Sequence, residues 1–451
     1  MSSFSHWLDH RFEVSARGST LRRELIAGLA TFTTMAYVLI VHPRVLASAG
    51  MDIKGLVTVT ALAAAIFSFV MGIWSNYPIV LAPAIGADVY FASQICIGMN
   101  IPWPAALGFV FYSGCLFFVI AISGLRQKII EAFPEELKVA ITAGIGLFIA
   151  FVGLRSAGVV VAQPRSLVTL GDLTSATPLL ALGGVLVGAI LLIRRVPAAI
   201  LVTILTITLI GFFIPAPGGK GMITPWPKSP LAWPSPINQL FCKLDFVYFW
   251  THLSQTIPIV LALLFTDIFG SMAALIAICT RAGLVGPGGK LDHLKEALEA
   301  DALAGAGGAI LGTSTTHYYI ESTVGVEEGG RTGLVSITVA VCFLLALVFN
   351  PIILIIPAVA TAPALILIGI FMMEGLATID LKNLSIAAST ALTMLLMLLG
   401  TIQDGLCLGF LSYVIIEVAV GRGGRISPYT YGLGVLFLLH YVLPLFLPGT
   451  R

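Results

Sequence analysis

The chain alternates between long apolar segments and short polar connections. A helix that crosses a bilayer needs about 20 predominantly apolar residues. Fourteen segments meet this requirement: 24–41, 56–73, 79–98, 104–122, 137–155, 177–193, 197–214, 251–278, 297–311, 314–330, 332–349, 357–374, 383–400 and 403–420. A further apolar stretch, 430–447, either crosses the membrane or lies in its interface. The pattern predicts an all-α polytopic membrane protein.

One of these spans is interrupted by a strongly polar run. Residues 313–316 are four consecutive hydroxyl residues, and the β-branched and aromatic side chains of 313–320 favour a strand. A helix start is predicted at Glu321. Extended backbone at bilayer depth cannot face lipid, so it must be buried in protein or line a cavity. Transporters build substrate sites on such broken spans; the alternative is a polar loop outside the membrane.

A second interruption falls in the third predicted span. Pro83 has no N–H and suits a first helical turn, so 78–82 is predicted to be extended and 84–98 helical. Two extended segments can satisfy each other's backbone groups. We therefore predict that residues 79–83 and 314–319 form short antiparallel strands near the bilayer midplane, each followed by a half-helix.

The composition agrees with a membrane protein. The 451 residues are 58% hydrophobic and only 10% charged, whereas soluble domains carry about 25% charged residues. The net charge of +2 falls in short loops, so no nucleic-acid partner is expected. The six cysteines show no paired spacing, which predicts no disulfide, metal site or cofactor. Residues 1–20 lack an apolar core, so no cleavable signal peptide is expected.

Basic residues predict the orientation of the spans. With fourteen spans, the loops that carry Lys and Arg fall on one side, which places the N-terminus in the cytoplasm. The loop 215–250, with seven prolines, is then external and separates two halves of seven spans. Because seven is odd, the second half is inverted relative to the first, as in many transporters. The basic residues are Arg11, Arg17, Arg22, Arg23, Arg126, Lys128, Arg194, Arg195, Arg281, Lys290, Lys295, Arg422 and Arg425.

Three carboxylates are predicted to lie inside the membrane. Asp267 is central in the eighth span, and Asp88 and Glu321 lie in the first turns of the two half-helices. An intramembrane carboxylate costs several kcal/mol and is a functional candidate by default. The alternatives are a structural hydrogen-bond anchor for Asp267 and a backbone N–H cap for Asp88.

Two histidines are candidates of lower rank. His317 alternates with Tyr318 along the predicted strand, so one side chain faces a cavity and the other faces packing. His42 precedes a proline at the predicted end of the first span. We expect it to serve as a cap or to belong to a loop.

Four stretches resemble one transporter family. They are Thr31–Ile40 (TFTTMAYVLI), Leu81–Phe91 (LAPAIGADVYF), Gly312–Leu334 (GTSTTHYYIESTVGVEEGGRTGL) and Ala360–Leu365 (ATAPAL). They resemble the AzgA-like hypoxanthine–guanine–adenine permeases of the nucleobase/ascorbate (nucleobase–cation symporter 2) superfamily. The resemblance extends over residues 20–420, and the string from Gly312 to Leu334 is long and specific.

The resemblance implies fourteen spans in a 7+7 inverted repeat, a core domain, a gate domain and proton-coupled, elevator-like transport by a homodimer joined through the gate. The implied divisions are 1–20 (cytoplasmic segment), 21–124 and 251–350 (core), 125–214 and 351–420 (gate), 215–250 (external loop) and 421–451 (C-terminal segment).

The family's binding carboxylates correspond to Asp267 and Glu321. The chain departs from the pattern at Asp88, where Asn is usual, at Gly270, where a second acid is usual, and at His317, where a small hydroxyl residue is common.

The predicted function is import of purine bases by proton symport across the inner (plasma) membrane. Carboxylates accept hydrogen bonds from ring N–H and amine groups, and half-helix N-termini donate to carbonyls. Burial disfavours a charged carboxylate, so Asp267 or Glu321 can carry the coupling proton. The predicted substrate-binding residues are Asp88, Asp267, Glu321, Thr33, Phe265, Tyr318, His317, Ala87 and Ile320.

The same residues leave one other substrate class open and give no support to an enzyme. The acid-rich site also suits a small organic cation or another amine-bearing heterocycle, whereas three acids without a basic residue disfavour an anion. No HExxH motif or nucleophile–base set points to an enzyme. An ionised Asp88 only accepts hydrogen bonds. We therefore expect adenine, guanine or a guanidine-like cation to bind better than xanthine or uracil.

Overall fold

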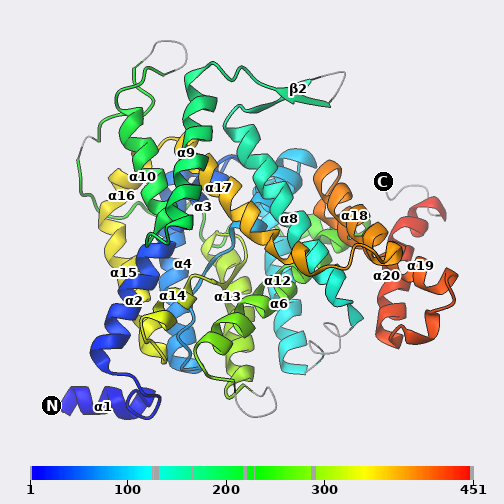
Figure 1. Ribbon diagram of the computed structural model, residues 1–451, viewed down its shortest axis with the longest axis horizontal. Helices are drawn as coiled ribbons and strands as arrows, with labels where there is room; N and C mark the ends of the chain where they lie inside the picture. The colour runs from blue at the N-terminus through cyan, green and yellow to red at the C-terminus, as the bar shows by residue number, and fades with distance from the viewer. Residues whose placement is uncertain are drawn as a thin grey trace.

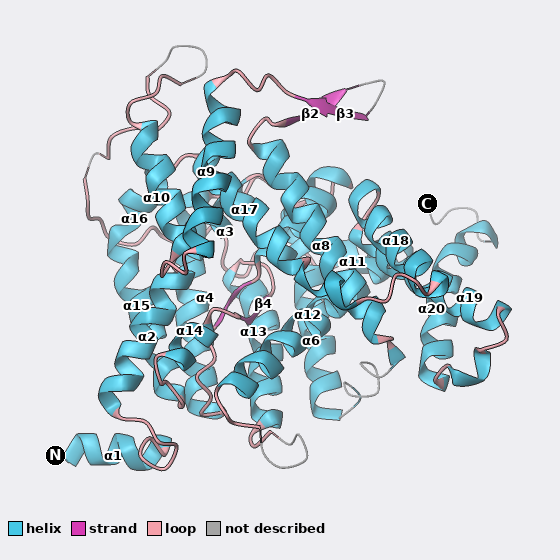
Figure 2. Ribbon diagram, in the orientation of Figure 1, coloured by secondary structure: helices cyan, strands magenta, loops and turns pink. Residues whose placement is uncertain are grey.

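The computed structural model describes residues 3–123, 125, 132–163, 167–216, 221–227, 229–285 and 291–446. Within these ranges the protein is mostly helical, with two small sheets (Figure 2). The predicted class, a helical polytopic membrane protein, is confirmed. Arg126, Lys128 and Lys290, which contributed to the predicted orientation, lie outside the described residues.

Nine helical segments of the described chain are long and apolar enough to cross a membrane. Two shorter apolar helices, α10 (Ala199–Gly211) and α18 (Leu384–Leu399), also coincide with predicted spans. The predicted ninth span is α13 (Leu294–Leu311), and the predicted third and tenth are the broken elements described below. The nine segments are Leu21–Ala47, Ile53–Trp74, Trp103–Ser123, Glu135–Ser156, Ala176–Ile193, Leu253–Arg281, Gly333–Ile355, Ala358–Thr378 and Ile402–Ala419.

The two predicted strands are present and pair as predicted. β1 (Leu81–Pro83) and β4 (Thr316–Tyr318) are antiparallel, with Ala82 opposite His317 in the middle of the register. Figure 2 shows this strand pair in the interior, surrounded by helices. Each strand leads into a short helix: α5 (Ile85–Val89), continued by the π-helix η1 (Tyr90–Gly98), and α14 (Ser322–Glu327).

Serine hydroxyls satisfy the backbone on the open sides of the strand pair. Ser68 Oγ donates to the Leu81 carbonyl at 2.8 Å and accepts from the Leu81 N–H at 3.1 Å. Ser322 Oγ accepts from the Val80 N–H at 3.0 Å. These bonds matter because an unpaired backbone group in a membrane interior costs several kcal/mol. Short strands are therefore stable here only because neighbouring helices complete their hydrogen bonding.

The first predicted span is not one continuous helix. It is divided into α2 (Leu21–Met35) and α3 (Val38–Ala47), which meet at Ala36 and Tyr37. The expectation for His42 was wrong, because this residue lies inside α3 and is fully buried. Pro43 does not end the helix, because α3 continues beyond the proline to Ala47.

The remaining helices pack in two groups. The first group consists of α4 (Ile53–Trp74), α6 (Trp103–Ser123), α12 (Leu253–Arg281), α13 and α15 (Gly333–Ala346), together with α2 and α3. Of these helices, α3, α4, α12 and α13 contact the strand pair. In the second, α8 (Glu135–Ser156) and α17 (Ala358–Met372) pack against α9 (Ala176–Ile193), α10, α18 and α19 (Ile402–Ala419). In Figure 1 the second group continues at the right into α20 (Pro428–Phe446), which covers residues 430–446 of the last apolar stretch.

Two elements outside the membrane spans were not predicted. The N-terminal residues form helix α1 (Ser3–Phe12), which lies across the end of α2 in Figure 1. A hairpin of β2 (Val160–Gln163) and β3 (Leu167–Leu170) extends from the opposite end of the molecule. These elements are too short to show a clear hydrophobic periodicity, so the sequence pattern did not reveal them.

Glycines allow the closest helix crossings. Gly72 of α4 and Gly333 at the start of α15 meet backbone to backbone, and a Cβ on Gly333 would overlap the Gly72 carbonyl oxygen. Gly146 of α8 and Gly369 of α17 meet in the same way. Small residues at such contacts are how membrane helices gain packing energy without a hydrophobic driving force.

Replacing Gly333 with alanine is therefore expected to destabilise the protein. The new methyl group must push α4 and α15 apart, which costs about 1–3 kcal/mol. We expect a lower melting temperature of the detergent-purified protein. The control is Gly183→Ala in α9, where a Cβ would meet no heavy atom within 4 Å. An unchanged melting temperature for Gly333→Ala would show that this crossing is not tight.

Candidate functional site

Glu321 lies where the polar strand becomes a helix. It immediately precedes α14, and its side chain is half-buried. Its Oε1 accepts a hydrogen bond from the Tyr37 hydroxyl at 2.5 Å. Tyr37 is located at the break between α2 and α3. The contact thus joins the interruption of the first span to the interruption of the tenth.

Asp267 lies in the middle of α12 and is almost fully buried, with 2% of its surface exposed. Thr315 Oγ1 donates to Asp267 Oδ2 at 2.7 Å. Thr315 belongs to the extended residues just before β4, and its carbonyl also accepts from the Ala84 N–H at 3.0 Å. Strand pairing therefore fixes the residue that orients the Asp267 carboxylate.

Asp88 is fully buried and both of its oxygens are engaged. Ser314 Oγ donates to Oδ1, and His42 Nδ1 lies 2.5 Å from Oδ2. The other ring nitrogen of His42, Nε2, lies 2.7 Å from Thr313 Oγ1. A buried carboxylate is tolerated only when charge and hydrogen bonds compensate its lost hydration. Asp88 meets this condition through side chains and not by capping a backbone N–H.

Two of the three carboxylates are held by one short piece of backbone, and the third, Glu321, lies where the same polar run ends and α14 begins. Consecutive residues, Ser314 and Thr315, contact Asp88 and Asp267 respectively. Tyr319 lies between Thr315 and Glu321 in the chain, and its hydroxyl donates to the Pro83 carbonyl. We call the three carboxylates beside the β1–β4 pair the acceptor-rich centre. Among the residues described, no three His, Cys, Asp or Glu side chains are placed to hold a metal ion.

The strand register settles the choice between His317 and Tyr318. The Tyr318 hydroxyl donates to the Ala297 carbonyl of α13 at 2.6 Å, so this side chain faces helix packing. His317 points to the other face, with Nδ1 3.1 Å from the Tyr318 carbonyl. Its Nε2 lies 3.7 Å from the point where a Cβ on Gly270 would be. Two of the departures from the family pattern, Gly270 and His317, therefore face each other.

The remaining predicted residues take different positions. Phe265 is buried in an aromatic cluster with Phe133, Phe269 and Phe437, at ring distances of 5.3, 6.1 and 5.7 Å. Thr33 is exposed, and its hydroxyl donates to the Ala30 carbonyl of its own helix. Ala87 is buried beside Asp88 in α5, whereas Ile320 is 48% exposed. The Thr33 hydroxyl is hydrogen-bonded within its own helix, and this bond does not connect it to any of the three carboxylates.

Of the residues of this site, Tyr37 was not singled out from the sequence, and His42 was expected only in a cap or loop. Both belong to the first span, which looked like a continuous apolar helix ending near His42. A histidine and a tyrosine within an apolar segment were the available signal, since polar groups inside a membrane require a partner.

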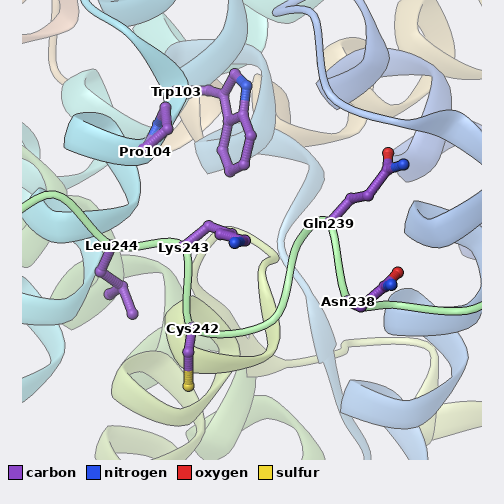
Figure 3. Close-up of a pocket in the computed structure, with 7 residues that line it drawn as sticks. All are labelled: Trp103, Pro104, Asn238, Gln239, Cys242, Lys243 and Leu244. Carbon is purple, nitrogen blue, oxygen red and sulfur yellow. The ribbon is translucent and has the colours of Figure 1, made fainter.

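A surface cavity of about 520 Å³ lies elsewhere (Figure 3). It is lined by Trp103 and Pro104 at the start of α6 and by residues of the segment 238–244. None of the predicted site residues lines it. No carboxylate lines this cavity, so the candidate site remains the acceptor-rich centre beside the strand pair.

Comparison with known proteins agrees with a transporter. Residues 22–404 match the profile of the Permease family (Xan_ur_permease). The chain belongs to this family. The permease is 34% identical to the adenine permease AdeP of Escherichia coli (strain K12), over 96% of each chain. It is 37% identical to the guanine/hypoxanthine permease PbuG of Bacillus subtilis (strain 168), over 96% of this chain and 98% of that protein. The predicted resemblance to AzgA-like permeases is thus confirmed. The prediction of a transporter rather than an enzyme is confirmed by the same family membership.

The fold of the permease is shared with a solved structure. The transmembrane domain of the cyanobacterial bicarbonate transporter BicA matches with a TM-score of 0.63, covering 85% of this chain and 97% of that one. At 15% identity this likeness concerns the fold alone.

Proposed function

We propose that this permease imports purine nucleobases of the adenine, guanine and hypoxanthine class, together with protons. The observation that carries the proposal is its full-length similarity to proteins named as adenine and guanine/hypoxanthine permeases. The acceptor-rich centre at the strand crossing supports it, because these bases present several N–H groups to a binding site. The membrane is the inner (plasma) membrane, with the N-terminus on the cytoplasmic side.

In this proposal the carboxylates have separate roles. Glu321 is half-buried and next to a helix start, so it accepts hydrogen bonds from N–H groups of the base. Asp267, almost fully buried in the middle of α12, also accepts from the base, and because a carboxyl group can take up and release a proton it carries the coupling proton. Asp88 adds negative charge through Ser314 without needing to touch the base. His317, on the face opposite Tyr318, contributes to the shape of the site.

The proposed architecture is a 7+7 inverted repeat of fourteen spans. The core domain comprises 21–124 and 251–350, and the gate domain comprises 125–214 and 351–420. The two packing groups of helices support this division. Transport follows an elevator-like movement of the core against the gate, and two copies associate through the gate. In the contact between the groups, Gln94 of η1 accepts from the Ile402 N–H at 2.8 Å.

Uptake of labelled bases tests the proposed function. Cells without nucleobase permeases of their own would express this protein and receive adenine, guanine, hypoxanthine, xanthine, uracil or guanidinium. We expect saturable uptake of the first three, and an affinity for adenine and guanine about tenfold above that for xanthine, since an unmatched carbonyl beside carboxylates costs 1 kcal/mol or more. Absence of saturable purine uptake would refute the proposal, and preference for guanidinium would favour an organic-cation transporter.

A further inference from the structure

The extended residues 313–315, called here the hydroxyl segment, contact three ionisable side chains from three helices. The first residue of the segment bonds to His42 of α3, the second to Asp88 of α5 and the third to Asp267 of α12. His42 and Asp88 also bond to each other. The segment therefore links the half-helix of the third span to the central carboxylate of the eighth.

Every hydrogen-bonding atom of the His42 and Asp88 side chains already has a protein partner. Both ring nitrogens of His42 and both oxygens of Asp88 are used by protein partners, and neither side chain is exposed. His42 Nδ1 and Asp88 Oδ2, 2.5 Å apart, share one hydrogen bond. Pairing of this kind offsets the cost of burying the two groups. The pair therefore binds the hydroxyl segment and does not contact substrate.

The hydroxyl segment has few other constraints. At its start the Thr313 N–H donates to the Gly308 carbonyl at 2.9 Å, and at its end the Thr315 carbonyl accepts from Ala84. Between these bonds, the side chains of His42 and Asp88 set its path. A shift of the segment would move the Thr315 hydroxyl away from the Asp267 oxygen that it now orients at 2.7 Å.

We propose that His42 is a positioning residue for the substrate site. Together with Asp88 it holds the hydroxyl segment, so that Thr315 presents Asp267 in its working orientation. The inference rests on the proposed function, in which Asp267 and Glu321 form the site. A displacement of a fraction of an ångström within such a network changes binding strongly, even when the residue that causes it never contacts the ligand.

Variants at His42 test the inference by equilibrium binding of labelled adenine to the purified full-length protein. His42→Ala should raise the Kd about tenfold, because two buried hydrogen bonds are lost. His42→Asn keeps a donor near the Nδ1 position and should stay within about threefold of wild type. The double variant His42→Ala/Asp88→Asn should raise the Kd no more than the more severe single variant, since the pair acts as a unit. The control is His10→Ala, on the exposed side of α1.

Hydrogen exchange of the ligand-free protein gives a second readout. In His42→Ala, amide exchange within 313–318 should accelerate while exchange in the middle of α8 stays at its wild-type rate. The inference would be overturned if His42→Ala kept the wild-type affinity for adenine and the wild-type exchange rates in 313–318. It would also be overturned if the Kd increases of the two single variants multiplied in the double variant. If wild type binds no purine, the proposed function fails instead, and exchange alone decides the role of His42.

Discussion

Replacing Glu321 with glutamine is expected to raise the Kd for adenine about 100-fold. Hydrogen bonds to a charged acceptor contribute about 1.5–3 kcal/mol, and the amide keeps the size of the side chain while removing the charge. The Tyr37 hydroxyl, at 2.5 Å, still finds an acceptor in the amide oxygen, so local packing should persist. Equilibrium binding to purified protein, with the melting temperature as a check on folding, measures the effect.

Glu327→Gln is the matched control for that experiment. Glu327 lies at the other end of α14, its side chain is 61% exposed, and it pairs with Arg281 at 2.6 Å. Exposed ion pairs contribute 1 kcal/mol or less and lie outside the proposed site. Adenine binding should therefore be unchanged in this variant. A folded Glu321→Gln protein with the affinity of wild type would remove Glu321 from the site.

Asp267→Asn is expected to abolish accumulation against a gradient. The asparagine oxygen can still accept from Thr315, so the hydroxyl segment keeps its position, but an amide cannot take up and release a proton. In proteoliposomes with an imposed pH gradient, adenine should then only equilibrate between the two sides. Exchange of labelled for unlabelled adenine should continue, because exchange needs no net proton movement.

Asp172→Asn serves as the control for the loss of a carboxylate. Asp172 lies in the connection between β3 and α9, where its oxygen accepts from the Thr174 hydroxyl and N–H. Its replacement should leave accumulation intact. If Asp267→Asn still concentrates adenine in response to a pH gradient, the coupling proton is carried elsewhere, and Glu321 becomes the next candidate.

The broken spans were predictable because their signals are local. Pro83 removes a helical hydrogen bond wherever it falls, and the β-branched run before Glu321 favours extended backbone. The membrane then leaves such segments one solution, which is to pair with each other. The antiparallel pairing of β1 with β4 follows from these constraints without any knowledge of the surrounding helices.

The partners of the polar side chains were not predictable in the same way. The bonds of His42 to Thr313 and of Tyr37 to Glu321 join residues 271 and 284 positions apart. Apolar periodicity specifies that a helix forms, but it carries no information on which distant polar group lies beside it. For this reason His42 was expected in a cap or loop, although the structure places it fully buried beside Asp88.

The sequence by itself thus determined the membrane class, the two interrupted spans and the family, because hydrophobic length, proline and a specific polar string are properties of the chain alone. Tertiary structure decided the environment of each acid. It placed Asp88 against His42, turned His317 toward Gly270 and buried Phe265 among other aromatic rings. The physical reason is that buried charges are tolerated only with partners, and partners from distant spans are chosen by helix packing.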